Sequence, residues 1–306
     1  MSKAGKWATA HYPWPKGPME WIEKRVRYLS VPFTWDLPKA KQDLMQRDFT
    51  WDRAVVGGPA VELMPEYLDG MGWVTIGHDM PGVLQRVNPH ATRTTLGCIR
   101  KCGFCGIGCG KIEAGGFREL EDWPDLPILC DNNLLAASMD HLDKVTRRLS
   151  KWGWCDFNQG LDARLMTPEK AALLARIEKP CIRFSVDSDA EKESVLAAVE
   201  ICQSAGIFKQ NCRKHYVLVG FNTGPDEAWE RCLWVEQRTF KANPMWFHPL
   251  DALERNSITD AQRALGWTHR DRADLQRYFY QRCGLPPGKY RDSMWGRKDQ
   301  AHDGDE

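Results

Sequence analysis

The sequence predicts an α/β protein built around a parallel sheet. From about residue 91 onward, short β-type runs alternate with amphipathic segments. Two of these segments open with residues typical of helix starts, Thr167-Pro168-Glu169 and Gly224-Pro225-Asp226. Strands that alternate with helices are typical of parallel sheets, and six repeats suit a partial barrel better than a closed barrel of eight units.

The first 90 residues predict an arm followed by a small α/β cap. Residues 1–20 carry Lys, Pro and Gly and contain no continuous apolar run. Residues 25–31 and 53–57 are predicted as short strands, with a helix at 39–47 between them. We therefore expect a first domain at 1–90.

A second domain is expected at 91–252. Its strands are predicted at 91–97, 127–133, 154–160, 180–189, 215–222 and 244–250. Its helices are predicted at 136–150, 168–178, 190–205 and 225–240. In parallel sheets of this kind the ligand site lies at the carboxyl ends of the strands.

A third region, at 253–306, is expected to be a helical extension. Residues 263–298 carry nine Lys/Arg against three Asp, and aromatic residues are interleaved with these charges. Such a segment can follow a phosphate backbone and stack on bases. A solvated helix with a charged tail is the alternative interpretation.

Composition excludes several classes of protein. The chain of 306 residues is 42% hydrophobic, which excludes a disordered protein of low hydrophobicity, and no stretch of 18 apolar residues predicts a membrane span. The first 20 residues lack the apolar core of a signal peptide, so a cytoplasmic location is expected. In that reducing compartment, 11 cysteines indicate metal binding, catalysis or burial rather than disulfides.

The strongest motif is the C-x3-C-x2-C loop formed by Cys98, Cys102 and Cys105, directly after the predicted strand at 91–97. Three thiolates within eight residues can reach one metal centre, and thiolate ligation favours zinc or an iron–sulfur cluster. Three ligands leave one position open, as in catalytic sites. With Cys109 the loop could instead form a closed four-cysteine site, although the second paired arm of a structural zinc site is missing.

In its spacing and position this loop resembles the defining motif of the radical S-adenosylmethionine (radical SAM) superfamily. The resemblance covers about residues 91–250 and implies a partial (β/α)6 barrel with a [4Fe–4S] cluster on Cys98, Cys102 and Cys105. It further implies that SAM binds the open iron and is cleaved, after one-electron reduction, to methionine and a 5′-deoxyadenosyl radical that abstracts hydrogen from a substrate. An external reductant of the flavodoxin or ferredoxin type is implied as well.

The resemblance also implies which side chains contact SAM. Phe104, the residue before the last cysteine of the motif, would stack near the adenine. Asp131 and Asn133 lie in a Cys-Asp-Asn-Asn sequence that looks like the D-D-N-F element of the cobalamin-binding and methylthiolating subgroup, and they would accept hydrogen bonds from the SAM ammonium. Further expected cofactor contacts are Gln159, Arg164, Arg183, Ser185 and Val219.

The chain departs from this subgroup in two ways. The D-x-H-x-x-G loop of the cobalamin-dependent relatives is absent, so no cobalamin is expected, and the unit at 25–58 looks like a remnant of their N-terminal domain. No cysteine precedes Cys98, whereas methylthiolating relatives carry three further N-terminal cysteines for a second cluster. That reaction is therefore not expected.

The resemblance also indicates a class of substrate. The compact pattern is similar to members encoded by bacteriophages, some of which act in the hypermodification of thymine in phage DNA. This similarity implies DNA or a modified nucleotide as partner, and an isomerisation that moves a glycyl adduct from a nitrogen to a carbon linkage. Tyr216, His248 and Asp251 are candidate catalytic residues on the late strands, and each is equally consistent with a structural role.

Two alternatives remain open at this stage. The first is a radical SAM enzyme that acts on a peptide or a small metabolite. The second is a non-catalytic nucleic-acid-binding protein stabilised by zinc or a cluster, with Cys109 as the fourth ligand. The oligomeric state is not predicted.

Overall fold

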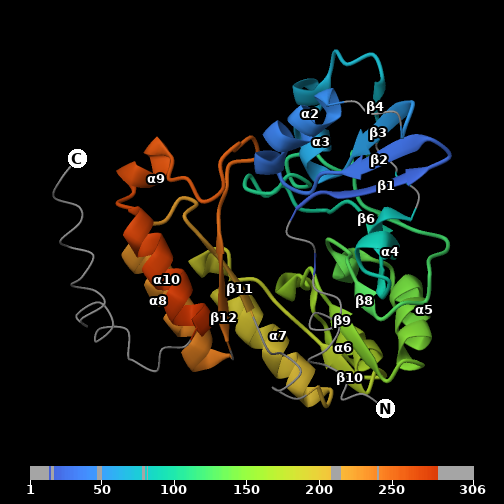
Figure 1. The fold of residues 1–306 in the computed structure, drawn as a ribbon. Helices are drawn as coiled ribbons and strands as arrows, with labels where there is room; N and C mark the ends of the chain where they lie inside the picture. The colour runs from blue at the N-terminus through green and yellow to red at the C-terminus, as the bar shows by residue number, and fades with distance from the viewer. Residues whose placement is uncertain are drawn as a thin grey trace.

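The computed structural model describes residue 14 and residues 17–46, 50–77, 80, 82–207, 215–239 and 241–281. Within these ranges the chain is a mixed α/β protein with several sheets, which confirms the predicted class (Figure 1). None of the described helices has the length and apolarity that crossing a membrane requires.

The N-terminal unit is a four-stranded sheet with two main helices. Its strands in spatial order are β1 (Met19–Glu23), β2 (Val26–Ser30), β3 (Arg53–Gly57) and β4 (Val74–Ile76), and its helices are α2 (Leu37–Met45) and α3 (Pro59–Leu63). Strand β1 is antiparallel to β2, and the other pairs are parallel. Leu37, Leu44 and Val56 are fully buried in the core between these elements.

The prediction of β2, α2 and β3 is confirmed, but β1 and β4 were not predicted. Both are edge strands of their sheet. Most β1 side chains are exposed, and β4 has three residues, so neither carries an apolar alternation that a local pattern could reveal. Strand β1 begins inside the expected arm, whereas residues 1–13, 15 and 16 lie outside the described residues.

The central region contains two parallel sheets. One has the order β10 (Lys179–Cys181), β9 (Trp154–Phe157), β8 (Ile128–Leu129) and β5 (Ala91–Thr92), and the other pairs β11 (His215–Val219) with β12 (Ala242–Trp246). Isolated parallel bridges, Leu161 to Phe184 and Ser185 to Tyr216, connect the two sheets. The strands thus follow one another in space in chain order, and no closed barrel forms among the described residues.

The expected strand at 91–97 is instead two short strands. Residues 91–92 belong to the parallel sheet, and β6 (Thr95–Leu96) pairs antiparallel with β7 (Arg118–Glu119). The chain changes sheet because the N–H groups of Thr94 and Thr95 donate to the Asp131 carboxylate, at 2.7 and 2.5 Å, instead of to a neighbouring strand.

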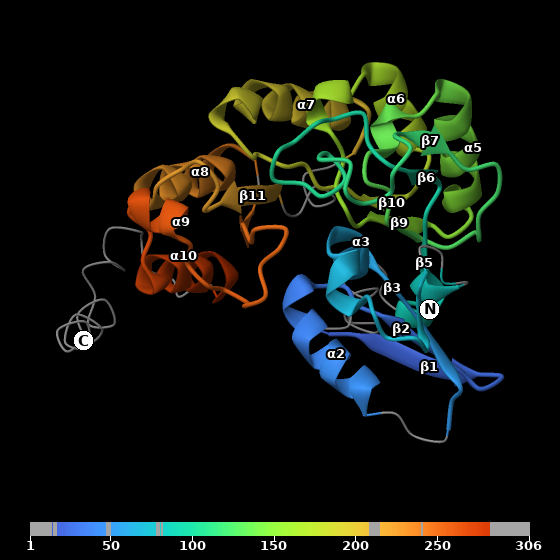
Figure 2. The ribbon, with the colours of Figure 1, turned by 90° about the horizontal axis from the view of Figure 1, so that it is seen from above.

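Four helices follow the parallel strands, as predicted. They are α5 (Met139–Ser150), α6 (Pro168–Leu174), α7 (Lys192–Ser204) and α8 (Pro225–Arg238). The Thr167 side chain caps α6 by accepting from the Lys170 N–H, and Gly224 precedes Pro225 at the start of α8, which confirms both predicted helix starts. In Figure 2, α5, α6 and α7 lie along one side of strands β9 and β10.

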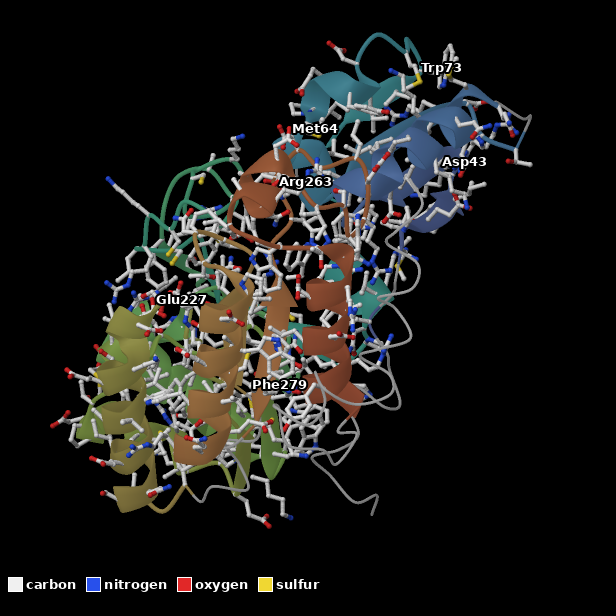
Figure 3. The ribbon with its side chains drawn as sticks, turned by 90° about the vertical axis from the view of Figure 1, so that its left-hand side faces the viewer. Asp43, Met64, Trp73, Glu227, Arg263 and Phe279 are labelled. Atoms are coloured by element: carbon white, nitrogen blue, oxygen red, sulfur yellow. The ribbon has the colours of Figure 1, made fainter. Side chains whose placement is uncertain are left out.

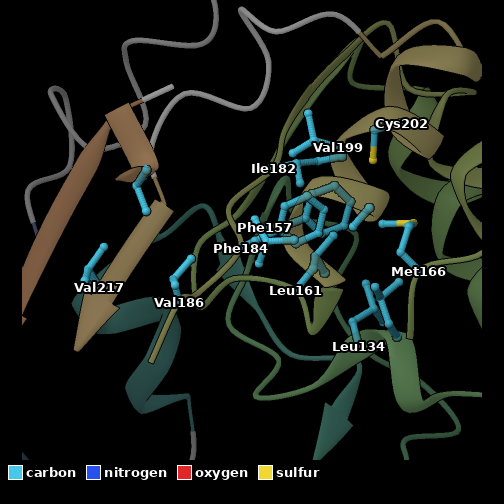
Figure 4. Packing of buried hydrophobic residues seen from close by; sticks show 14 of the residues in the cluster. Leu134, Phe157, Leu161, Met166, Ile182, Phe184, Val186, Val199, Cys202 and Val217 are labelled. Atoms are coloured by element: carbon cyan, nitrogen blue, oxygen red, sulfur yellow. The ribbon is translucent and has the colours of Figure 1, made fainter. Parts of the chain in front are cut away.

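The core of this region lies between the parallel strands and those helices. Phe157, Phe184, Ile182 and Val199 are members of one buried apolar cluster (Figure 4). Helices α9 (Asp260–Ala264) and α10 (His269–Gln281) follow β12, and α10 packs against α8 and β12.

The described part of the C-terminal extension is helical, as predicted, but its aromatic residues serve mainly the core. Trp267 is buried, and Phe279, labelled on α10 in Figure 3, lies 5.3 Å from the Trp229 ring of α8 between centroids. Tyr280 is half exposed. Residues 282–306, which hold the rest of the basic and aromatic segment, lie outside the described residues.

Candidate functional site

The cysteine loop leaves the sheet through the β6–β7 hairpin. Gly97, directly after β6, has a φ of +71°, and a Cβ there would lie 2.1 Å from the carbonyl oxygen of Gly116. Only glycine permits two backbone segments to approach so closely in this conformation. The close contact between Gly97 and Gly116 therefore determines the position at which Cys98 leaves the hairpin.

The three motif cysteines are half-buried, whereas Cys109 is exposed. The N–H of Cys105 donates to the Cys102 carbonyl at 3.1 Å, and the N–H of Cys109 donates to the Cys105 carbonyl at 2.8 Å. The Cys109 thiol itself donates to the Gly103 carbonyl at 3.3 Å. In this structure Cys109 thus supports the backbone of the loop from its outer side.

The thiols of the motif act on one another electrostatically. Burial is the main cause that raises the pKa of Cys102, and the charges of Cys105 and Cys98 raise it further. Asp187 also raises this pKa, whereas Arg164 lowers it. These two side chains, which lie far along the sequence, therefore belong to the surroundings of the loop.

No group of three or more His, Cys, Asp or Glu side chains in the described ranges is placed to hold a metal ion. The donor chemistry of the loop is nevertheless that of soft metals, because its three candidate ligands are all thiols. In an iron–sulfur cluster each thiolate binds its own iron atom, so the three sulfurs need not converge on one point as they do around a single ion.

Asn133 lies against the first cysteine. Its Nδ2 is 3.5 Å from Sγ of Cys98 and 3.4 Å from Oδ2 of Asp162. The side chain is buried, and its Oδ1 has no hydrogen-bond partner in the described part of the protein. A buried acceptor without a donor costs free energy, so this atom is suited to a donor supplied by a ligand.

Asp162 joins Asn133 to two arginines. It accepts from Nε of Arg100 and from Nε of Arg164, both at 2.7 Å. Burial raises the pKa of Asp162, but the hydrogen bonds and charges of the two arginines outweigh this and leave the pKa lowered. Arg164, an expected cofactor contact, is thus near the cysteine loop, with its charge balanced by Asp162 and Glu191.

Asp131 is hydrogen-bonded to the segment that precedes the cysteine loop. Its carboxylate accepts from the N–H groups and the hydroxyls of both Thr94 and Thr95. Burial is the main cause that raises its pKa, and these hydrogen bonds oppose the shift. Because its oxygens are engaged within the protein, we assign Asp131 to positioning the segment that leads into the cysteine loop.

The segment that continues from β10, residues 181–187, offers a polar face at the end of the sheet. Along 181–187, apolar side chains alternate with polar ones, as successive residues of a strand point to opposite faces. Ile182, Phe184 and Val186 are buried in the core. The alternate residues are half-buried, and they are Cys181, Arg183, Ser185 and Asp187.

Arg183 is held by Asp156 on the neighbouring strand. The guanidinium donates to both carboxylate oxygens, and also to the Phe157 carbonyl at 3.3 Å. Burial lowers the pKa of Arg183, but the hydrogen bond and charge of Asp156 raise it overall. Tyr216, a candidate catalytic residue, lies beside this pair and donates its hydroxyl to the Asn158 carbonyl at 2.8 Å.

Ser185 and Asp187 interact directly, since the hydrogen bond from Ser185 lowers the pKa of Asp187. The larger effect is burial, which together with Glu191 raises that pKa to about 6. Gln159 is exposed just beyond β9. The Val219 carbonyl accepts from the Phe247 N–H at 2.9 Å, so its backbone oxygen serves the junction with β12.

A chain of aromatic contacts leads from the cysteine loop to the end of β12. Phe104 meets Phe221 edge-on, with ring centroids 5.4 Å apart, and Phe221 meets Phe247 at 4.8 Å. His248 comes next in sequence and lies 4.7 Å from the Trp35 ring in η1 (Thr34–Asp36) of the N-terminal unit.

His248 and Asp251 follow β12 where the chain contacts the N-terminal unit. Nε2 of His248 accepts from the Asn256 N–H at 3.1 Å, and burial is the main cause that lowers the pKa of this histidine. Asp251 is exposed in the turn that follows β12. It precedes Ala252, whose carbonyl accepts from Thr34 of the N-terminal unit.

Sequence reasoning missed Glu113, which organises the loop. Its carboxylate accepts from the Gly97 N–H at 2.7 Å, from Nδ2 of Asn132 at 2.8 Å and from Arg93. Its own N–H donates to the Glu62 carboxylate of α3 at 2.9 Å. A lone glutamate near two glycines carries no spacing signal, because its partners come from three separate parts of the chain.

Comparison with known proteins adds no relative. No protein-family model matches the chain, and no curated protein matches it.

Proposed function

We propose that this protein is a radical SAM enzyme with a [4Fe–4S] cluster on Cys98, Cys102 and Cys105. The observation that supports it most is the combination of the C-x3-C-x2-C loop, placed after the first parallel strand, with the unpartnered Oδ1 of Asn133 beside Cys98. When bound, the cluster would supply one electron to SAM, whose sulfur–carbon bond breaks to leave methionine and a 5′-deoxyadenosyl radical. In this proposal the six parallel strand segments form a partial barrel.

The protein's own residues bind and orient SAM. Oδ1 of Asn133 accepts a hydrogen bond from the SAM amino group, while its Nδ2 stays directed at the Cys98 sulfur. Arg164 lies near the loop and can turn part of its donor set to the SAM carboxylate. Phe104 offers an apolar ring to the adenine.

The half-buried polar face of 181–187 faces the substrate in this proposal. Arg183 with Asp156, Tyr216, and Ser185 with Asp187 provide donors and acceptors there. Following the sequence resemblance, the proposed substrate is a glycyl adduct of thymine in DNA. Removal of a hydrogen atom from the glycyl α-carbon would leave a stabilised radical that can migrate, and an external one-electron donor would reduce the cluster.

The test is anaerobic reconstitution with iron and sulfide, reduction with dithionite and addition of SAM. The expected product is 5′-deoxyadenosine, detected by chromatography, and Cys102→Ala should abolish it. Cys109→Ala is the matched control, and it should retain both the cluster absorption and the product. A protein that binds one zinc ion, makes no 5′-deoxyadenosine and loses its metal in Cys109→Ala would instead have a closed structural site.

A further inference from the structure

The segment that follows β12 is fastened to the N-terminal unit. Oγ1 of Thr34 donates to the Ala252 carbonyl at 2.5 Å, and the Trp35 ring lies against His248. Asn256 adopts a left-handed conformation with a φ of +62° and donates its N–H to His248. Arg255 thus lies on a turn between two hydrogen bonds, one from Thr34 to Ala252 and one from Asn256 to His248.

Two arginines lie close enough to this junction to act on its charges. Arg255 is exposed, and it forms no ion pair with any residue that the structure describes. Nε of Arg272 in α10 is buried and has no hydrogen-bond partner among those residues. Burial and the charge of Arg255 lower the pKa of Arg272, so the two cations act on each other. An anion between them would relieve the repulsion and fill the unused donor.

Lys39 and Asp36 also face this place. One Asp36 oxygen, Oδ2, is buried without a partner in the described part of the chain. Burial raises the pKa of Asp36, whereas Arg255 and Lys39 lower it. The cations outnumber this carboxylate, and His248 has its pKa lowered by burial, by Arg255 and by Arg272, which favours its neutral form. The junction therefore combines an excess of positive charge with one acceptor that has no partner among the described residues.

An aromatic surface borders the same junction. Phe33 and Trp35 stack with ring centroids 4.6 Å apart and an interplanar angle of 10°, and Phe33 is 37% exposed. The exposed ring is thus Phe33, and Trp35 supports it from behind. An exposed aromatic ring next to guanidinium groups is a combination that binds single-stranded nucleic acid, because bases stack on the ring and the cations bind phosphates. The contacts through Phe104, Phe221 and Phe247 lead from here to the cysteine loop.

We propose that Arg255 and Arg272, with the Phe33–Trp35 rings, form a binding subsite for a nucleotide phosphate and its base. The inference rests on the proposed function only in naming this ligand as the substrate of the cysteine-loop site. Binding at the junction itself requires neither iron nor SAM.

The experiment measures the fluorescence anisotropy of a short fluorescein-labelled single-stranded oligothymidylate with the full-length protein, without iron or SAM. Salt is varied from about 50 to about 200 mM. Arg255→Gln should reduce the slope of log affinity against log salt by about 0.7, the value for one phosphate contact to a single strand. Phe33→Leu should weaken binding roughly 5- to 100-fold, because one base loses its aromatic partner.

The matched control is Arg238→Gln, which removes an exposed arginine at the C-terminal end of α8. It should leave both the slope and the affinity unchanged. Competition with thymidine 5′-monophosphate distinguishes the source of the phosphate. The mononucleotide displaces the labelled oligonucleotide if the subsite binds a single nucleotide, and it does not if binding requires several linked phosphates.

The proposal is overturned if Arg255→Gln binds with the wild-type slope, or if Arg238→Gln changes the slope as much. It is also overturned if Phe33→Leu binds as tightly as the wild type. Failure of the proposed function is a separate result, namely binding at the junction in a protein that forms no 5′-deoxyadenosine.

Discussion

In the proposed site, single buried polar atoms decide which side chains are available to a ligand. Asn133 is buried beside Cys98, with its Nδ2 committed to the sulfur and to Asp162 and its Oδ1 unpartnered among the described residues. Asp131, two positions earlier, accepts hydrogen bonds from Thr94 and Thr95 at both of its oxygens. The two residues with the same expected role thus differ, because Oδ1 of Asn133 has no donor among the described residues whereas each Asp131 oxygen has at least one.

Asn133→Ala should weaken SAM binding about 10- to 100-fold while the cluster still forms. The reason is the loss of one hydrogen bond to a charged group, worth roughly 1.5–3 kcal/mol. Calorimetric titration of the reconstituted protein with SAM measures the affinity, and visible absorption measures the cluster. Asn243→Ala, on β12, is the control and should bind normally. Wild-type affinity in Asn133→Ala would exclude the assigned contact.

His215 makes folding depend on pH. It is fully buried, stacks on Phe184 at 5.7 Å and accepts from the Phe184 N–H, and burial lowers its pKa from 6.5 to about 4. Between these values the unfolded chain binds the proton and the folded chain does not. Because of His215, the free energy of unfolding is therefore highest above pH 6.5. It falls by up to about 3 kcal/mol as the pH falls towards 4.

Urea unfolding between pH 7 and pH 4 checks this expectation. His215→Gln keeps a side-chain acceptor and should show a shallower decline of the free energy of unfolding with falling pH. His269→Gln, an exposed position at the start of α10, serves as the control. The variant-to-wild-type difference separates this effect from Asp187, whose raised pKa of about 6 acts in the opposite direction. Equal slopes in His215→Gln and wild type would contradict the assignment.

At the scale of elements, local patterns predicted the helices well and the positions, but not the lengths, of the parallel strands. The expected helices at 136–150, 168–178, 190–205 and 225–240 all exist, because their apolar periodicity and caps are local properties. The expected strands at 127–133 and 180–189 are reduced to β8 and β10, and at 91–97 the Asp131 side chain, which follows β8, accepts from two backbone N–H groups that would otherwise serve the sheet. The cysteine loop behaves similarly, since its shape depends on close backbone contacts.

Gly108→Ala should damage the cysteine loop, whereas Gly103→Ala should be tolerated. A Cβ at Gly108 would lie 2.6 Å from the Cys102 nitrogen and 2.7 Å from its oxygen, while at Gly103 the nearest atom is Phe221 Cζ at 3.9 Å. The first change forces the backbone of the candidate ligand Cys102 to move, and the second makes an ordinary contact. Iron bound per chain after reconstitution measures the difference. Equal iron content would show that the loop geometry is not critical.

At the scale of the whole molecule, the N-terminal unit supports the cysteine loop. Glu62 of α3 accepts from the Glu113 N–H, and Glu113 in turn holds Gly97 and Asn132. A Cβ on Gly106 would lie 3.3 Å from a Leu63 methyl group, so α3 also packs closely on the loop. Residues before 91 thus belong to the candidate site although no motif marks them.

Glu62→Ala should make the loop open more often. Loss of a hydrogen bond worth about 1 kcal/mol should speed amide exchange around Glu113 roughly five-fold. Hydrogen–deuterium exchange of the peptide that contains Glu113 measures this, and Glu66→Ala, an exposed neighbour in η2 (Pro65–Leu68), is the control. Unchanged exchange in Glu62→Ala would show that α3 is not needed to hold the loop.

The α/β class, the chain order of strands and helices and the cysteine motif can be read from the sequence, because apolar periodicity, helix caps and ligand spacing are local. Which polar atoms lack a partner depends on the fold. Asp131 accepts from Thr94 and Thr95 and Arg183 donates to Asp156, whereas Oδ1 of Asn133 has no partner among the described residues. The fold also brought Glu62, Glu113 and Trp35 to the candidate sites. These outcomes depend on hydrogen bonds between distant segments, and satisfaction of a buried polar group is a property of its neighbours in space.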